Sequence, residues 1–410
     1  MVFPHVIDAS SPSVATKKTG RARRWAVAAL MSMAGLLVGL LLSELVVSLV
    51  FPRPEKFYVR QPNLHATFTS SQDIMPGVPG PSEFITNSLG IRGDEFSERQ
   101  HYRILAIGGS TTECVYLDQG KAWPHLIQKR LSEFTGLNIW VGNVGVSGHN
   151  TRDHIVYMKY LPQQYPRVDA VMILVGVNDL SISISHPDYR PDLLQSPGGE
   201  GEVVRKAFYM RPSRFEKWWY RRLALWNLWG TVQRAYFSGP RQDRRGNIQK
   251  TRRDHRKDAM IVDQLPDLQP GLAEFRRNLN TLVDLAAANS VRLIFLTQPS
   301  IWREGLPAWE AGFLIMGKVA HPQTPGKTEY YSVKVLADAM ARYNQVTLEV
   351  CRIRGVECID LAAMLPKDLT VFYDDVHFND RGSRMVAEIV SDRLFATGFR
   401  DSTPQPSKNQ

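Results

Sequence analysis

Three apolar runs in this chain each lead into a turn that is rich in glycine and polar residues. They cover residues 103–108, 138–144 and 169–176, and two further runs lie at 291–298 and 356–360. Segments with apolar residues at helical spacing separate these runs. Such alternation predicts a parallel sheet with helices on both faces. We therefore expect a three-layer α/β/α sandwich, whose ligand site would lie beyond the carboxyl ends of the strands.

The first run ends in Gly108-Gly109-Ser110-Thr111-Thr112. A buried strand that enters a tight glycine turn leaves the hydroxyl of Ser110 exposed at the end of the strand, ahead of a helix. Paired glycines let the backbone turn sharply and let a substrate carbonyl approach closely. Ser110 is therefore a candidate nucleophile, although an ordinary strand-to-helix turn or a phosphate-binding nest has the same pattern.

The turns after the second and third runs offer hydrogen-bond donors. Gly148 follows the second run, and its backbone N–H can point toward the same edge of the sheet. Asn178 follows the third run, and its side-chain amide is a fixed donor suited to an oxyanion. The alternatives are a plain loop glycine at the first position and an Asn-Asp turn or helix cap at the second.

A candidate base lies near the other end of the chain, in Asp374-Asp375-Val376-His377. Acyl transfer by serine needs a base, a group that orients the base, and donors for the developing oxyanion. We expect His377 to be the base and Asp374 to orient it, with Asp375 the less suitable orienter.

The same four residues also fit a solvated loop before a helix at 381–394. In that interpretation Asn379 or Asp380 would be the N-cap of the helix.

Taken together, the four segments resemble the SGNH hydrolases, the GDSL-type esterase and lipase superfamily, over roughly residues 84–396. The resemblance implies a flavodoxin-like parallel sheet with Ser110 as nucleophile. It implies an oxyanion hole made of the Ser110 N–H, the Gly148 N–H and the Asn178 side chain. It also implies His377 as general base and Asp374 as its partner.

The first block departs from the usual Gly-Asp-Ser of this superfamily, because Gly108-Gly109-Ser110 stands in its place. This looks like the Gly-Gly-Ser-Thr variety, in which that aspartate is not catalytic. The run Thr-Asn-Ser-Leu-Gly-Ile-Arg-Gly at 86–93 is similar to the lead-in found before this variety. The departure leaves the substrate class open rather than the chemistry.

Residues 25–51 are almost wholly apolar and long enough to span a bilayer core of about 30 Å. Arg21, Arg23 and Arg24 precede them, which predicts a cytoplasmic amino terminus and an extracytoplasmic remainder. The length of the run and the lack of a clear Ala-x-Ala site favour an uncleaved anchor over a signal peptide. A buried core helix is the third alternative.

Cysteine and histidine usage adds two expectations. Cys351 and Cys358 lie across a predicted helix-to-strand turn and could pair in an oxidising compartment, whereas Cys114 is expected to be a packing residue. The ten histidines are scattered without metal-ligand spacing, so we expect no metal and no cofactor.

Residues 181–268 form an insertion that a minimal fold of this kind does not need. Residues 203–258 carry 16 Lys and Arg against 4 Asp and Glu, a charge of +12, whereas the whole chain carries +10. The insertion is compatible with a lid for an anionic or sugar-containing substrate, a surface that lies on anionic lipid, or a solvated helix. It holds four of the nine tryptophans, Trp218, Trp219, Trp226 and Trp229. We expect the tract 241–257 to be mobile because it has few apolar residues.

The 410 residues can hold one sizeable domain plus additions, and we expect six parts. They are a cytoplasmic tail (1–24), a transmembrane anchor (25–51), an extended linker (52–83), a hydrolase domain (84–398) with its insertion (181–268), and a disordered tail (399–410).

We expect a membrane-anchored, extracytoplasmic serine esterase, with an O-acyltransferase or a non-catalytic glycan- or lipid-binding scaffold as alternatives. The expected partners are an acyl ester of a lipid or glycan and the membrane, but no nucleic acid.

Overall fold

The computed structural model describes residues 16–51, 55–165, 167–237, 245–322, 324 and 326–397. It divides into two compact units. The first unit combines Met1–Arg53 with Glu216–Gly239, and the second combines Pro54–Phe215 with Pro240–Gln410. Most of the tail expected at 1–24, and all of the tail expected at 399–410, lies outside the described residues.

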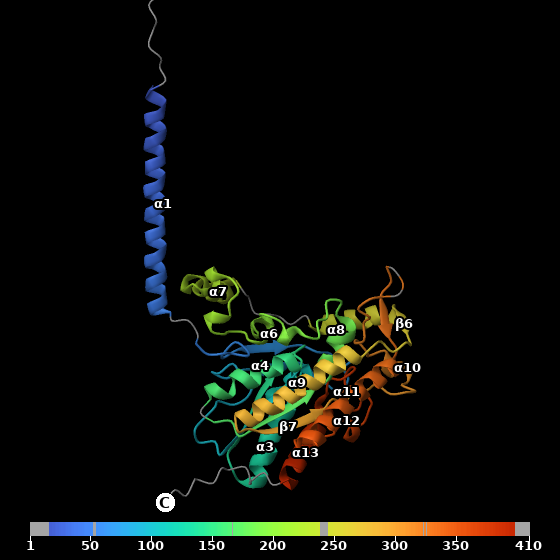
Figure 1. The fold of residues 1–410 in the computed structure, drawn as a ribbon. Coiled ribbons are helices and arrows are strands. Elements are labelled where there is room, and N and C mark those ends of the chain that lie inside the picture. The colour runs from blue at the N-terminus through green and yellow to red at the C-terminus, as the bar shows by residue number, and fades with distance from the viewer. Residues whose placement is uncertain are drawn as a thin grey trace, which may run out of the picture. The chain divides into compact units, whose positions relative to one another are not determined.

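A five-stranded sheet forms the centre of the second unit, and all of its strand pairs are parallel (Figure 1). The strand order is β4-β3-β5-β7-β9, which is the flavodoxin-like order. This confirms the predicted fold class. The strands are β3 (Tyr102–Gly108), β4 (Ile139–Gly145), β5 (Ala170–Val175), β7 (Arg292–Thr297) and β9 (Glu357–Ile359).

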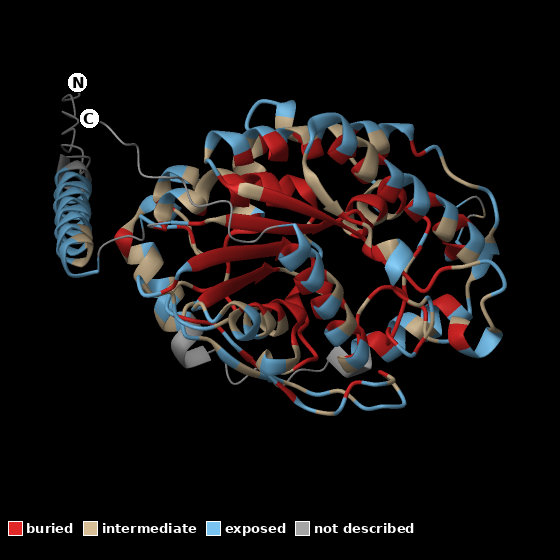
Figure 2. Ribbon diagram, turned by 90° about the horizontal axis from the view of Figure 1, so that it is seen from below, coloured by how far each residue is buried: buried red, intermediate tan, exposed pale blue. Residues whose placement is uncertain are grey.

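Helices cover both faces of this sheet, so that its strands are buried (Figures 1 and 2). On one face α3 (Trp123–Thr135) packs against α13 (Asp380–Ala396). On the other face α9 (Gln269–Ala288) contacts both α4 (Thr151–Tyr160) and α11 (Val333–Arg354). Every residue of β3, β4 and β5 is buried, which explains why these strands are continuous apolar runs in the sequence.

Shorter elements surround the sandwich, and some of them lie in the segment expected to be a linker. There β1 (His65–Phe68) pairs antiparallel with β2 (Ser82–Ile85), and the side chains of Phe57 and Val59 belong to the main core. A second small sheet pairs β6 with β8 in parallel. The remaining elements of this unit are α2 (Ser110–Glu113), η1 (Gln119–Lys121), η2 (Pro162–Gln164), α5 (Val177–Ser185), η3 (Leu193–Gln195), α6 (Gly199–Ala207), η4 (Ser213–Phe215), α8 (Arg245–Lys257), β6 (Met260–Val262), α10 (Ala308–Ala311), β8 (Glu329–Tyr331) and α12 (Leu361–Met364).

Helix α8 corrects the expectation that the tract 241–257 is mobile, at least over its described part. Arg256 is buried, and its guanidinium donates hydrogen bonds to the carbonyls of Met316 and Tyr331. Arg253 donates to the carbonyls of Phe313 and Tyr373, at 3.3 Å each. A tract poor in apolar residues is therefore held by long arginine side chains that bond to backbone carbonyls.

The first unit contains α1 (Thr16–Val50), η5 (Trp219–Arg222) and α7 (Ala224–Phe237). Within α1, Gly20–Val50 is long and apolar enough to cross a membrane. Helices α1 and α7 are in contact. The carboxylate of Glu44 in α1 accepts hydrogen bonds from the backbone N–H groups of Ala224, at 2.6 Å, and Leu225, at 3.0 Å.

Candidate active site

Ser110 is the first residue of α2 and follows the carboxyl end of β3 by one glycine. That glycine, Gly109, lies in a tightly packed position. A Cβ atom there would lie 2.2 Å from the Asn178 side-chain nitrogen and 3.2 Å from the carbonyl oxygen of His149. Packing therefore explains the glycine at the middle position of Gly-Gly-Ser, because a side chain there would displace Asn178.

The structure brings Ser110, His377 and Asp374 together. The His377 Nε2 atom lies 2.6 Å from the Ser110 Oγ atom. On the other side of the ring, Nδ1 lies 2.8 Å from each carboxylate oxygen of Asp374. Asp374 also accepts the backbone N–H groups of Val376 and His377, at 3.1 and 3.0 Å, so its carboxylate is fixed by the same loop that carries the imidazole.

Backbone contacts hold the two ends of the loop that carries His377 together. The Tyr373 N–H donates to the His377 carbonyl at 3.0 Å, and Phe372 forms an antiparallel bridge with Phe378. Asn379 ends the loop as the N-cap of α13, since its side chain accepts the Gly382 N–H at 3.0 Å. The sequence interpretation as a capped helix start and the interpretation as a base with its orienter therefore describe the same loop.

Asp375 has different partners from Asp374. Its carboxylate accepts the indole N–H of Trp302 at 2.9 Å and the backbone N–H groups of Ile315 and Met316 at 2.6 and 3.2 Å. These bonds tie the histidine loop to the segment that follows β7. Asp375 thus supports the position of the loop, and Asp374 is the carboxylate that faces the imidazole.

The ionised Asp374 carboxylate and the protonated His377 imidazole stabilise each other. Burial alone would lower the pKa of His377, but the Asp374 carboxylate and its hydrogen bond outweigh burial and raise this pKa above its usual value of 6.5. Burial alone would raise the pKa of Asp374, yet the charge and hydrogen bonds of His377 hold it below its usual value. For Asp375, burial and the neighbouring Asp374 charge both raise the pKa. Asp374 therefore stays ionised beside a strengthened base.

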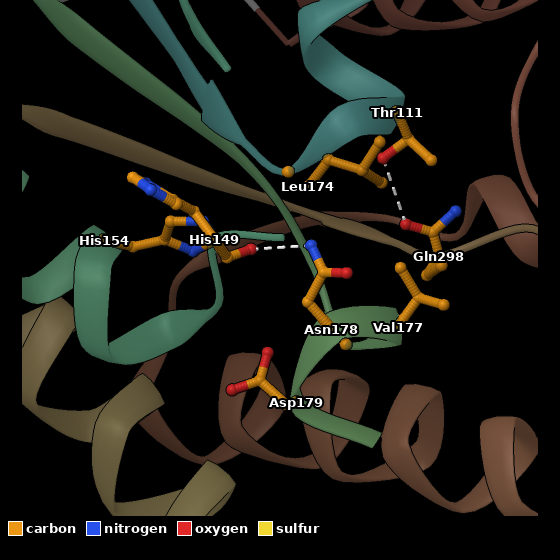
Figure 3. Close-up of a pocket in the computed structure, with 10 residues that line it drawn as sticks. Thr111, His149, His154, Leu174, Val177, Asn178, Asp179 and Gln298 are labelled. Atoms are coloured by element: carbon orange, nitrogen blue, oxygen red, sulfur yellow. Dashed lines mark hydrogen bonds between the residues drawn. The ribbon is translucent and has the colours of Figure 1, made fainter. Parts of the chain in front are cut away.

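The two expected backbone donors, the N–H groups of Ser110 and Gly148, have no hydrogen-bond acceptor among the residues that the structure describes. Gly148 has a φ of +82°, a left-handed conformation that favours glycine. The Asn178 amide donates one hydrogen to the His149 carbonyl at 2.7 Å, as Figure 3 shows. Its second hydrogen is left for another acceptor, because a side-chain amide carries two.

A network of polar residues joins the Gly148 turn to the Asn178 turn. Asp179 follows Asn178, and its carboxylate accepts both the backbone N–H and the hydroxyl of Thr151, the first residue of α4. Asn278 of α9 donates to the same hydroxyl at 2.9 Å. Burial raises the pKa of Asp179 to about 7. These bonds hold the amino ends of α4 and α5 at one spacing.

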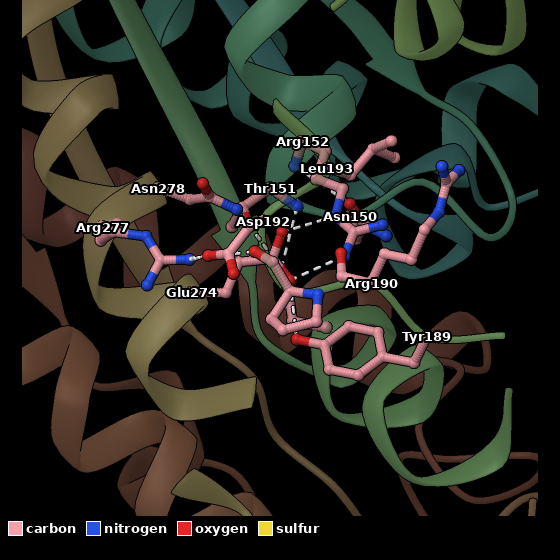
Figure 4. Close-up of polar contacts among 12 residues, drawn as sticks. Asn150, Thr151, Arg152, Tyr189, Arg190, Asp192, Leu193, Glu274, Arg277 and Asn278 are labelled. Carbon is pink, nitrogen blue, oxygen red and sulfur yellow. Dashed lines mark hydrogen bonds and ion pairs between the residues drawn. The ribbon is translucent and has the colours of Figure 1, made fainter. Parts of the chain in front are cut away.

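A buried ion pair between Arg152 of α4 and Glu274 of α9 lies next to this network. Arg152 lies next to Thr151, and its guanidinium bonds to both carboxylate oxygens of Glu274 at 2.6 and 2.7 Å (Figure 4). Arg152 also donates to the Arg190 carbonyl at 2.7 Å, and the Tyr189 hydroxyl donates to Glu274 at 2.7 Å. The first part of the insertion is thereby fixed against α4 and α9.

Glu113 is a buried residue near Ser110 that the sequence did not point to. Its carboxylate accepts the backbone N–H of Ser147 at 2.7 Å, accepts the hydroxyl of the same residue, and pairs with Arg60. Ser147 precedes Gly148, so Glu113 connects the helix that begins at Ser110 to the turn that carries Gly148. The sequence feature that could have indicated this role is the acidic residue three positions after Ser110, in a segment that is otherwise free of charge.

The lead-in at 86–93 acquires a structural explanation. The guanidinium of Arg92 is buried and donates to the backbone carbonyls of Glu113, Cys114 and Leu117. These three residues all follow Ser110 in the chain. Burial lowers the pKa of Arg92 to about 10. Arg92 thus replaces regular helix bonds after the short helix α2 and fixes its carboxyl end.

Two small hollows flank Ser110. One has an empty volume of about 180 Å³ and is lined by aromatic and apolar side chains beside Ser110 and His377, among them Tyr116, Tyr373 and Phe378. The other also has an empty volume of about 180 Å³ and contains Asn178, His149 and Gln298 (Figure 3). Gln298 directly follows β7 and lies 3.3 Å from the Thr111 hydroxyl, a polar position at the edge of the sheet that the sequence analysis missed.

Within the described part of the chain, no group of three or more His, Cys, Asp or Glu side chains could hold a metal ion. The expectation of no metal and no cofactor stays a prediction. Cys351 and Cys358 form a disulfide across the turn from α11 to β9, with Cα atoms 6.0 Å apart. Cys114 is a free, buried cysteine.

A parallel flavodoxin-like sheet with a serine, a histidine and an acid at its carboxyl edge defines the class of SGNH-type hydrolases. The family model of the GDSL-like lipase/acylhydrolase family matches residues 106–385. The chain therefore belongs to this family, and the predicted resemblance is confirmed.

Solved structures with a similar chain path are distant. Axe2, an acetylxylan esterase from Geobacillus stearothermophilus, is 15% identical, covers 75% of this chain and 98% of its own, and has a TM-score of 0.36. Est24, a carbohydrate acetylesterase from Sinorhizobium meliloti, is 11% identical, covers 72% and 99%, and has a TM-score of 0.37. A lipase/acylhydrolase from Enterococcus faecalis is 14% identical, covers 72% and 96%, and has a TM-score of 0.36. No curated protein matches the chain.

Proposed function

We propose that this protein is a membrane-anchored, extracytoplasmic serine esterase that hydrolyses an acyl ester through a covalent acyl-enzyme. One observation carries the proposal. The imidazole of His377 lies between the Ser110 hydroxyl, at 2.6 Å, and the Asp374 carboxylate, at 2.8 Å. These are the contacts that proton transfer from a nucleophilic serine to an oriented base requires.

In the first half of the reaction the Ser110 Oγ attacks the ester carbonyl while its proton passes to the His377 Nε2. The oxyanion that forms is stabilised by the Ser110 N–H, the Gly148 N–H and the second amide hydrogen of Asn178. His377 then gives its proton to the leaving alcohol oxygen as the ester bond breaks. The acyl group is left on Ser110.

In the second half a water molecule attacks the acyl-enzyme while His377 takes its proton. The tetrahedral intermediate collapses, the carboxylic acid leaves, and the proton returns to the Ser110 Oγ. Asp374 keeps the imidazole in one orientation and stabilises its charged form throughout. A glycan hydroxyl in place of water would make the enzyme an O-acyltransferase.

The hollow beside Ser110 and His377 supports an acyl ester as the substrate. Its walls include aromatic and apolar side chains, among them Tyr116, Leu117 and Tyr373, which suit the apolar part of an acyl group.

Two observations support the location. The helix Gly20–Val50 can span a membrane, and the arginines before it favour a cytoplasmic amino terminus. The disulfide between Cys351 and Cys358 fits an oxidising compartment, because cytosolic proteins rarely keep such bonds.

A fluorophosphonate probe tests the proposal, because it reacts covalently with an activated serine. We expect labelling of the full-length protein and its complete loss in Ser110→Ala. Ser70→Ala is the control, because Ser70 lies in the loop after β1 and its hydroxyl donates to the Gly80 carbonyl. Labelling that persists in Ser110→Ala, or that is absent from a preparation with esterase activity, contradicts the assignment.

The acceptor is tested on the same preparation with an acetyl ester. We expect acetate to be released into water at the same rate with and without an added glycan. Transfer of the acetyl group to the glycan would instead favour the acyltransferase, and ester binding without either reaction would favour a non-catalytic scaffold.

A further inference from the structure

The apolar span contains one charged residue. Between positions 25 and 51, Glu44 is the only Asp, Glu, Lys or Arg. A carboxylate in such a helix is costly in a membrane unless it has a partner. Its partners in the structure include the backbone N–H groups of Ala224 and Leu225, at 2.6 and 3.0 Å.

These two N–H groups belong to the first turn of α7, a helix of 14 residues. The first N–H groups of a helix lack partners inside the helix and carry partial positive charge. Glu44 therefore satisfies the amino end of α7, and α7 neutralises the carboxylate. Ala224 is buried in this contact region.

The position of Glu44 along α1 sets the depth of this contact. Glu44 lies six residues before Val50, where α1 ends, so it is about 9 Å from the end of the helix along its axis. If α1 spans the membrane as proposed above, this depth is the boundary between headgroups and acyl chains. The amino end of α7 then cannot lie in bulk water.

The segment around α7 has the composition that such a boundary requires. Its indole rings are exposed, with 73% of Trp219 and 56% of Trp229 accessible, and Trp218 and Trp226 are exposed as well. Lys217 lies over the Trp218 ring, 5.5 Å from its centre, and Arg221 and Arg222 belong to the adjacent turn. Tryptophan is enriched at membrane interfaces, and basic residues beside it attract anionic headgroups.

We propose that residues 216–237, which we call the interfacial segment, lie in the membrane surface beside the anchor, with anionic phospholipid as their partner. The grouping of these residues with α1 in one compact unit supports this inference. The inference rests on the anchor of the proposed function. It makes the tryptophan-rich part of the insertion a second membrane contact rather than a lid or a solvated helix.

Quenching of tryptophan fluorescence by lipids with brominated acyl chains tests the inference on full-length protein in phosphatidylcholine and phosphatidylglycerol vesicles. We expect replacing the four tryptophans of the segment with phenylalanine to reduce quenching at least about twofold, because they would be four of the five tryptophans close to the membrane, the fifth being Trp25 of the anchor. Trp309→Phe is the matched control, because Trp309 is 65% exposed and belongs to α10. Equal losses in the two variants, or no loss in the quadruple variant, overturn the inference.

A second comparison tests the lipid charge. We expect quenching to be stronger with phosphatidylglycerol than in phosphatidylcholine alone, and this difference to disappear in a variant with Lys217→Gln, Arg221→Gln and Arg222→Gln. Equal quenching of the parent in both lipids contradicts an anionic partner.

Failure of this inference can be told apart from failure of the proposed function. Flotation with vesicles and quenching of Trp25 report the anchor, and fluorophosphonate labelling of the same sample reports the serine. A labelled protein that floats but has unquenched segment tryptophans overturns the inference alone. A labelled protein that does not float overturns the anchor and the inference together, and leaves the esterase assignment standing.

Discussion

Two carboxylates in different units of this protein have similar backbone partners and different purposes. Asp374 accepts the N–H groups of Val376 and His377, and Glu44 accepts those of Ala224 and Leu225. Asp374 also faces the imidazole of His377. The comparison teaches that the remaining partner distinguishes two fixed carboxylates. In the function proposed above Asp374 acts on a partner that can titrate, whereas in the inference above Glu44 holds the end of a helix beside the anchor.

The strongest test of this comparison is Asp374→Asn. We expect kcat to fall by about 10⁴-fold, because an amide neither stabilises the charged imidazole nor holds its tautomer. Thermal unfolding measured alongside separates this loss from loss of fold. Asp375→Asn is the control, and because its partners are Trp302 and backbone N–H groups we expect a larger loss of stability and a smaller loss of kcat.

The pH dependence sharpens the same point. His377 must be neutral to accept a proton, and its pKa lies above 6.5. In the wild type, kcat/KM should therefore decline as the pH falls through a midpoint above 6.5. In Asp374→Asn burial is no longer opposed by the Asp374 charge, so the midpoint should move to lower pH. Superimposable acid limbs in the two proteins would contradict the role given to Asp374.

The next largest effect is expected from Gly109→Ala. The new Cβ would lie 2.2 Å from the Asn178 side-chain nitrogen, so Asn178 must move. Loss of one oxyanion donor should lower kcat/KM by about 10²- to 10³-fold. Gly120→Ala is a matched control, because nothing lies within 4 Å of a Cβ there. Similar rates in the two alanine variants would show that Asn178 does not act on the oxyanion.

A smaller effect is expected from Glu113→Gln. This change weakens the bonds that hold Ser147 beside Gly148 and leaves Arg60 without its carboxylate. We expect kcat to fall by about 10-fold with little change in KM, and stability to fall by about 1 to 3 kcal/mol. Glu133→Gln, at an exposed position of α3, is the control. A lower melting temperature with unchanged kcat would reduce Glu113 to a structural residue.

The smallest effect on turnover is expected from Glu44→Ala. Hydrolysis of a soluble ester should be unchanged, whereas amide hydrogen exchange at the amino end of α7 should become faster. The loss of a helix cap of this kind corresponds to about 1 kcal/mol. Ser48→Ala, one turn further along α1, is the control because its hydroxyl bonds to the Leu45 carbonyl within the same helix. Equal exchange in both variants would contradict the capping role.

Much of the fold followed from the sequence because buried parallel strands are continuous apolar runs. All five expected strands are present, and because they are parallel their carboxyl ends lie at the same edge of the sheet. Asn379 was recognised as one of two possible helix caps because a capping side chain lies next to the helix it serves. Local patterns of this kind are visible in one sequence.

Contacts between distant parts of the chain were not predictable in this way. Arg92 and Glu113 are charged residues in buried positions. The sequence around them does not indicate that Arg92 bonds to backbone carbonyls or that Glu113 bonds to the turn after the next strand. The docking of α8 by Arg253 and Arg256 was missed for the same reason, since composition alone suggested a mobile tract. The sequence left three alternatives open for residues 216–237, because the contact between Ala224 and Glu44 joins positions 180 residues apart.

The docking of α8 has a practical consequence for anyone who shortens this chain. Arg253 bonds to the carbonyl of Tyr373, the residue immediately before Asp374. The insertion is therefore not one removable piece. Deletion of residues 216–237 should yield a protein that still turns over soluble esters, whereas deletion extended through α8 would take away a support of the histidine loop.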